Sequence, residues 1–182
     1  MKKFGILLAI SLLLLIVLSP SCVGTSEVTA RGANQFPQVG GMNLHGDEQQ
    51  FPDCLQAEQT ILIVAFQRWQ QEWVDEWYAQ IDPLLKSNIK LAYYEVPTIS
   101  KLSSPIRWWI YKGMRGGIED PQMRSSVITL HIDKEPFKKH LNIIDEEIVY
   151  VFLVDKDGNI KARSKGRYDQ DKWLSIAQEI TP

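Results

Sequence analysis

The chain contains two cysteines, Cys22 and Cys54, and their thiols are the side chains best suited to covalent chemistry. Cys54 lies in the segment Phe51-Pro-Asp-Cys-Leu55. A displaced peroxidatic or partner-binding thiol would make the protein a thiol-dependent peroxidase or another oxidoreductase that uses Cys54. The sequence favours the alternative, a small residue packed under a loop, because cysteine is among the most buried residue types.

Cys22 ends an N-terminal segment that is typical of a secretory signal. Lys2 and Lys3 precede an uncharged apolar run over residues 5–18, and small residues follow it. The run is short for a membrane-spanning helix. These features predict a signal peptide over residues 1–21, lipidation of Cys22, and an exported protein anchored in the cell envelope on a periplasmic or outer face. A cleaved signal without lipid and an uncleaved anchor remain alternatives.

The sequence after Cys22 divides into a tether and one domain. Residues 22–41 are rich in glycine, serine, threonine and other polar residues without periodicity, which predicts a flexible tether. Residues 42–182 then form a single domain. The chain has 20 basic and 22 acidic residues, with a net charge of −2. This balance excludes the concentrated basic surface that binds nucleic acid, so the expected partners are a membrane and a protein.

A glycine-rich stretch over residues 113–120 is a candidate anion-binding loop. Glycines expose backbone amides and arginines add positive charge. The residues concerned are Arg115, Gly116, Gly117 and Arg124. The stretch is not a P-loop, because the Gly-Lys-Ser/Thr ending is absent. The alternative is a helix C-terminus and a turn before the next strand.

The three histidines, His45, His131 and His140, have no metal-ligand spacing with one another or with Cys54. The sequence therefore predicts no metal site. No cofactor motif is present, so we expect no cofactor. A catalytic set of serine, histidine and aspartate is not indicated either.

Strand and helix patterns alternate along the domain. Continuous apolar runs rich in β-branched residues predict strands covered on both faces, and spacings of three and four predict amphipathic helices. Pro83 is expected to kink or shorten the first helix. The predicted elements are a hairpin over 42–52, a strand over 60–66, a helix over 69–85, a strand over 89–96, a helix over 103–114, a strand over 127–132, a helix over 135–141, a hairpin over 147–164 and a helix capped by Asp169.

This order of elements resembles the thioredoxin superfamily, especially its membrane-tethered thioredoxin-like and peroxiredoxin-like branches. The resemblance is carried by FKKHLNI and YVFLVDKDGNIKARSKG within residues 137–166, and by the entry segment MNLHGDEQQFPDCLQ before TILIVAF. It covers about residues 42–180. It implies an α/β fold: a thioredoxin-like mixed β-sheet with helices on both faces and an N-terminal hairpin.

A narrower similarity is to the mitochondrial ATP-synthase assembly factors of the Atp-ten type and their bacterial relatives. The matching segments are VAFQRWQQEWVDEW at 64–77, GMRGGIEDPQMR at 113–124 and ITLHIDKEPFKKHL at 128–141, with the hairpin that follows. This similarity implies an assembly or chaperone role.

The sequence departs from the redox branches of the superfamily where their chemistry lies. In those branches the first turn of the helix after the strand at 60–66 carries a nucleophilic thiolate, often in Cys-x-x-Cys. Here the turn contains no sulfur, and the approach to the strand near residue 150 lacks the family's proline. Enzymatic activity is therefore not expected from this turn. Its residues instead form a candidate partner-binding surface: Arg68, Trp69, Gln70 and Gln71.

A row of tryptophans at positions 69, 73 and 77 runs along this helix. Trp73 and Trp77 are expected to pack in the core, because helix positions that face a sheet need large apolar groups. Trp69 is expected to be exposed at the first turn. The sequence thus favours a non-catalytic binding or assembly protein, with the Cys54 oxidoreductase as the competing hypothesis.

Overall fold

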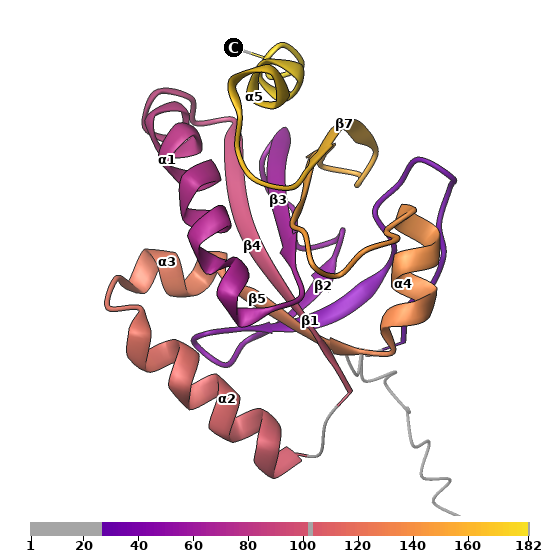
Figure 1. Ribbon diagram of the computed structural model, residues 1–182, viewed down its shortest axis with the longest axis vertical. Coiled ribbons are helices and arrows are strands. Elements are labelled where there is room, and N and C mark those ends of the chain that lie inside the picture. Colours follow the sequence, from indigo (N-terminus) through magenta and orange to yellow (C-terminus); the bar gives the residue numbers. More distant parts are fainter. Residues whose placement is uncertain (1–26, 102–103, 182) are drawn as a thin grey trace, which may run out of the picture.

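A computed structural model describes residues 27–101 and 104–181 of the chain (Figure 1). The predicted signal peptide and Cys22 lie outside the described residues. The strands are β1 (Val39–Asn43), β2 (Glu48–Phe51), β3 (Gln59–Ala65), β4 (Leu91–Ser100), β5 (Ile128–Ile132), β6 (Tyr150–Asp155) and β7 (Ile160–Lys165). The helices are a short 3₁₀ turn, η1 (Arg68–Gln70), followed by α1 (Gln71–Ser87), α2 (Ser104–Gly117), α3 (Pro121–Ser126), α4 (Lys134–Leu141) and α5 (Gln170–Ala177).

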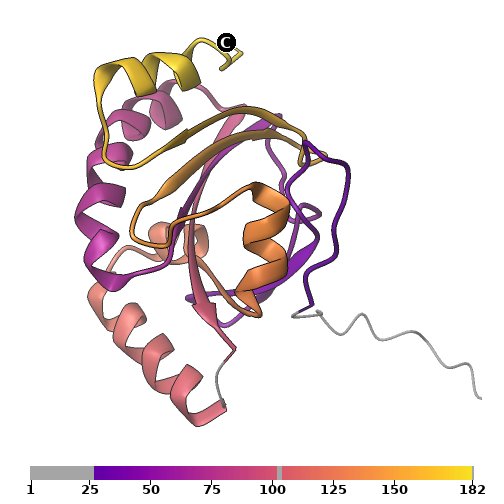
Figure 2. The ribbon, with the colours of Figure 1, turned by 45° about the vertical axis from the view of Figure 1, so that its right-hand side comes forward.

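The strands form one seven-stranded mixed sheet in the order β2-β1-β5-β4-β3-β6-β7. β3, β4 and β5 are parallel, and the pairs on either side of them are antiparallel. The strand β3, paired on both edges, is buried along its whole length, as its continuous apolar sequence predicted. Helices cover both faces of the sheet (Figure 2). The predicted fold class is confirmed.

Alternate residues of the strands feed two separate cores, because successive side chains of a strand point to opposite faces. One core packs α1 and α5 against the sheet, with Trp77 and Ile176 fully buried. The other core packs α4 and the N-terminal segment, with Phe36 and Phe137 fully buried. The described part of the chain contains no helix with the length and apolar character needed to cross a membrane.

Three features differ from the sequence prediction. Phe36 and Val39 are fully buried within the stretch expected to be a flexible tether, so the folded domain begins before residue 42. Pro83 lies inside α1, which continues to Ser87 because its apolar residues remain packed on the core. The helix α3 was not predicted; it is short, with Pro121 in its first turn and Asp120 as its N-cap.

Candidate functional site

The start of the first long helix stands where the chain leaves the centre of the sheet. β3 ends at Ala65, and η1 and then α1 follow within a few residues. Arg68 and Trp69 are exposed, and half of the Trp69 side-chain surface is accessible. A large aromatic side chain in water at a helix start is unfavourable within an isolated chain, and aromatic residues are enriched in protein interfaces.

Gln70 belongs to the interior and not to the exposed surface. Its side-chain oxygen accepts hydrogen bonds from the backbone amides of Phe66 (2.8 Å) and Gln67 (3.1 Å). Its side-chain nitrogen donates to the carbonyl of Glu146 (2.7 Å). The residue is fully buried. The interpretation of Gln70 as a partner-contact residue is therefore wrong, because both polar atoms are used to hold the helix start.

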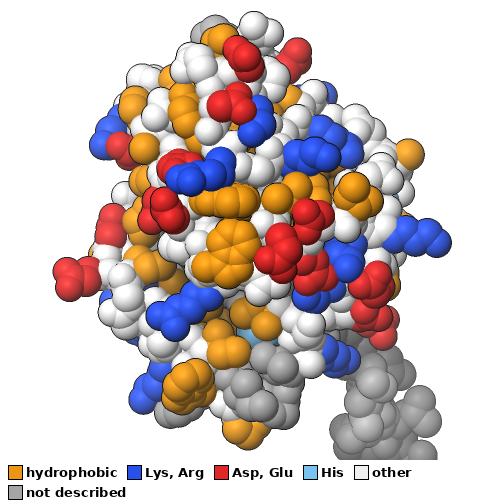
Figure 3. All heavy atoms as spheres, in the orientation of Figure 1, with side chains coloured by type: hydrophobic (Ala, Val, Ile, Leu, Met, Phe, Trp, Pro, Cys, Tyr) orange, Lys and Arg blue, Asp and Glu red, His pale blue; other side chains and the backbone are white. Residues whose placement is uncertain are grey.

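Trp69 extends into a surface that also contains Trp73 and Arg167. The two indole rings meet edge to face, with 5.1 Å between their centroids. The Arg167 guanidinium lies 5.9 Å from the centre of the Trp73 ring. Figure 3 shows hydrophobic side chains gathered over α1, with charged side chains of both signs around them. We define Arg68, Trp69, Gln71, Trp73 and Arg167 as the tip surface.

Ion pairs fix Arg167 in this surface. Its guanidinium pairs with Glu76 and, at 3.1 Å, with Glu72. The hydrogen bond with Arg167 lowers the pKa of Glu76 and raises that of the guanidinium. The two carboxylates offset the charge of Arg167 and hold its guanidinium beside the partly buried Trp73, next to the exposed Trp69, an arrangement that suits a partner with an apolar or aromatic group.

The loop before β6 lies against the other side of the helix start. Lys134 and Lys138 of α4 both pair with the Glu146 carboxylate, the second at 2.9 Å. Partial burial alone would raise the pKa of Glu146, but the hydrogen bonds from the two lysines lower it. Since Gln70 binds the carbonyl of Glu146, this residue connects α1 on one face of the sheet with α4 on the other.

A buried acid lies beneath the first turn of α1. Glu95 of β4 is almost fully buried, and its carboxylate accepts a 3.4 Å hydrogen bond from Gln71. Burial raises the pKa of Glu95 to about 7, with the hydrogen bond from Gln71 lowering it and the nearby Asp75 raising it. Glu95 was not among the functional residues predicted from the sequence. One sequence feature could have identified Glu95: it lies two residues after the buried Tyr93 in β4, and alternate residues of a strand point to the same face.

The candidate anion-binding residues do not form a cradle of free amides. Gly116 and Gly117 belong to the last turn of α2, where the partial negative charge of the helix disfavours an anion. The Arg124 side chain donates to the carbonyls of Ile118 (2.7 Å) and Arg115 (3.5 Å). The alternative interpretation, a helix end and a turn, describes this segment.

Cys54 lies away from the helix start. It packs against the core that contains α4, whereas α1 packs on the opposite face of the sheet. The thiol is half-buried, and desolvation raises its pKa to about 12, with a smaller contribution from Asp53. A thiol with such a pKa is protonated at neutral pH and is a poor nucleophile.

We expect the thiol of Cys54 to react slowly in the folded protein. In a Cys22→Ser variant, where Cys54 is the sole cysteine, a disulfide reagent at pH 8 should modify it about a thousandfold more slowly than after unfolding in urea, because the thiolate fraction is smaller by that factor. Absorbance of the released thiolate measures the rate. Folded and unfolded rates within tenfold of each other would instead show an accessible, ionised sulfur.

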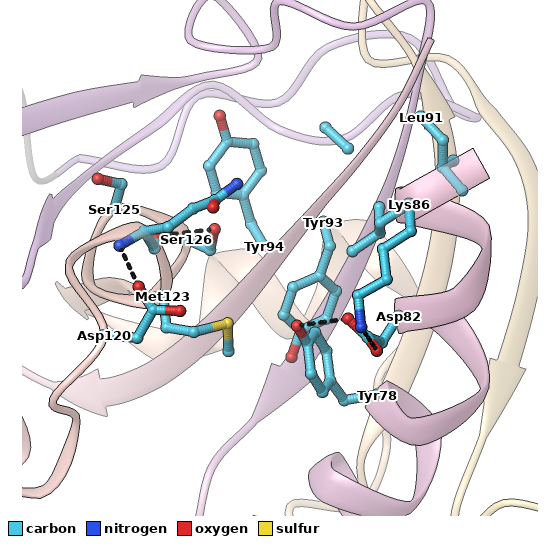
Figure 4. A pocket seen from close by; sticks show the side chains of 13 residues that line it. Tyr78, Asp82, Lys86, Leu91, Tyr93, Tyr94, Asp120, Met123, Ser125 and Ser126 are labelled. Carbon is cyan, nitrogen blue, oxygen red and sulfur yellow. Dashed lines mark hydrogen bonds and ion pairs between the residues drawn. The ribbon is translucent and has the colours of Figure 1, made fainter. Parts of the chain in front are cut away.

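A cleft of about 650 Å³ lies between α1, α3 and β4 (Figure 4). Tyr78 donates to Asp82 at 3.4 Å, and Lys86 pairs with the same carboxylate at 2.6 Å. Asp120 accepts from the backbone of Gln122 as the cap of α3. These polar groups therefore bind one another within the cleft. Among the residues that the structure describes, no three His, Cys, Asp or Glu side chains are grouped to hold a metal ion.

The sheet order and the sulfur-free start of α1 define a thioredoxin-like protein without a cysteine at the start of its first long helix. The family described as ATP10 protein matches residues 26–174, which is most of the chain. The chain belongs to this family, and both resemblances found in the sequence are thereby confirmed. A search of the curated proteins finds no match.

Solved structures with the same fold include several redox proteins. BsSco, a member of the Sco family of cytochrome c oxidase assembly proteins, has a TM-score of 0.55 and 13% identity, over 80% of this chain and 91% of that one. The thioredoxin domain of a thiol-disulfide oxidoreductase from Bacteroides vulgatus has a TM-score of 0.53 and 12% identity, over 81% and 95%. At this identity the similarity establishes the fold.

Proposed function

We propose that this chain is a non-catalytic binding protein with an assembly role, exported and anchored to a membrane by its N-terminal segment, and that it contacts a protein partner through the tip surface. The observation that carries the proposal is the exposed Trp69 at the helix start where the redox branches of the superfamily hold a thiolate. Membership of the ATP10 protein family supports the assembly role. The N-terminal apolar run followed by Cys22 supports export and anchoring.

The rigidity of the tip surface favours binding. Trp69 is braced by Trp73, and Arg167 is fixed by two carboxylates, so little side-chain entropy remains to be lost on association. Tryptophan and arginine are also the side chains that dominate binding energy in interfaces. The competing hypothesis, an oxidoreductase that uses Cys54, has no comparable support. The pKa of the Cys54 thiol is raised, and Cys54 lies on the opposite face of the sheet from α1.

A photoreactive amino acid at position 69 of the full chain tests this proposal in cells. We expect it to capture a protein at a yield at least about threefold above the same probe at Lys172 on α5, because a partner seated on the tip surface excludes water from position 69. Arg167→Ala should reduce the capture at 69 and leave that at 172 unchanged. Equal yields at the two positions would contradict a binding role for this surface.

A further inference from the structure

The helix α2 carries a net positive charge, whereas the complete chain is acidic. Its sequence contains Arg107, Lys112 and Arg115 and no acidic residue. The complete chain has a net charge of −2, so the residues outside α2 carry −5. α2 is thus a positively charged element of an acidic protein, as is β7 with its three basic residues and no acid, and this charge favours a negatively charged partner for the helix.

One side of α2 is attached to the domain. The Tyr111 hydroxyl donates to the carbonyl of Leu44 at 2.9 Å, and the Met114 sulfur lies 3.9 Å from the Thr129 hydroxyl. The helix runs along the outside of the fold at one end of the molecule (Figures 1 and 2). These contacts fix which side of α2 faces away from the sheet.

The outward side combines an aromatic ring, charge and bare backbone. The Trp109 side chain is 74% exposed, and Lys112 is exposed beside it; the exposed Arg115 lies at the edge of this side, where its guanidinium donates to the Tyr111 hydroxyl at 3.4 Å. Gly113 and Gly116 follow at helical spacing, and a Cβ added to either would meet nothing within 4 Å. Glycine weakens a helix, and no contact within the described residues explains why α2 has glycine at these two positions. Without side chains at these positions, the helix backbone can lie close to a flat surface.

We propose that α2 lies on an anionic membrane surface, with Trp109 at the level of the lipid headgroups and Lys112 and Arg115 near lipid phosphates. Tryptophan is enriched at the interface between lipid and water, and basic amphipathic helices bind anionic lipids. Each Lys or Arg near such a surface strengthens binding about fivefold.

The short segment between Cys22 and the folded domain supports a membrane as the partner of α2. Phe36 is buried in the core and follows Cys22 by 14 residues, which span at most about 50 Å. If the chain is anchored near Cys22, the domain cannot move farther than this from the bilayer. This proximity rests on the proposed anchoring, whereas the charge and exposure of α2 do not.

Lipid capture tests the proposal with the full chain. A photoreactive amino acid at position 109 should form lipid adducts in vesicles of phosphatidylglycerol mixed with phosphatidylcholine. We expect a yield about fivefold above the same probe at Leu174, an exposed apolar position on α5. The yield should fall at least about tenfold with Lys112→Glu and Arg115→Glu together, and several-fold in vesicles of phosphatidylcholine alone.

Flotation of the vesicles separates this proposal from the proposed anchoring. A chain that floats with both kinds of vesicle but gives equal adducts at 109 and 174 is anchored, and the proposal for α2 is then wrong. If the chain floats only with anionic vesicles and forms adducts at 109, the result supports membrane binding by α2 and contradicts the N-terminal anchoring. Capture of a second copy of the chain at 109 in place of lipid, or no flotation with anionic vesicles, overturns the proposal.

Discussion

Replacing Gln70 by alanine is expected to lower the free energy of unfolding by about 3 kcal/mol. The substitution removes three hydrogen bonds and leaves the backbone amides of Phe66 and Gln67 without their acceptor. A buried donor that loses its partner costs about 1–3 kcal/mol. Urea unfolding monitored by tryptophan fluorescence measures the change.

The neighbouring Gln71 provides the matched control. It is exposed, and its side chain makes hydrogen bonds of 3.1 Å and 3.4 Å to Asp75 and Glu95. Gln71→Ala should therefore cost less than about 1 kcal/mol. If Gln70→Ala were no more destabilising than Gln71→Ala, the side chain of Gln70 would not stabilise the helix start. That result would favour the earlier interpretation of Gln70 as an exposed contact residue.

The stability of the folded protein is expected to depend on pH through Glu95. Burial raises its pKa from 4.5 to about 7, so the folded state binds a proton that the unfolded state releases. This contribution is fully present below pH 4.5 and is lost as the pH rises through about 7. The loss amounts to about 3 kcal/mol, because one pKa unit corresponds to about 1.4 kcal/mol.

Comparison with Glu95→Gln isolates this effect from other titrating groups. The amide cannot ionise, so the variant should gain stability relative to the natural chain as the pH increases from 5 to 8, by about 3 kcal/mol in total. Urea unfolding at each pH gives the difference. Glu119 is exposed and provides the control. The stability of Glu119→Gln should show the same pH dependence as that of the natural chain. A constant difference between Glu95→Gln and the natural chain would show that Glu95 stays ionised when buried.

The site is predictable from sequence only where a local pattern defines it. The periodicity of α1 placed Trp77 in the core and Trp69 in water, and the structure confirms both. Gln70 lies between them, and no local signal separates it from Gln71. Its inward orientation depends on the carbonyl of Glu146, 76 residues later. A polar residue at a helix start is therefore assigned to the surface or the interior only by what the fold brings next to it.

The sequence by itself determined the order of the strands and of the helices other than η1 and α3, the missing cysteine at the helix start, and the caps of single elements such as Asp169. These features follow from neighbours along the chain. The tertiary structure decided which distant groups meet. It placed Arg167 beside Trp73, Glu95 beneath Gln71 and Phe36 in the core. The physical reason is that strand order and sheet face set these contacts, and burial and charge act across space without regard to separation along the chain.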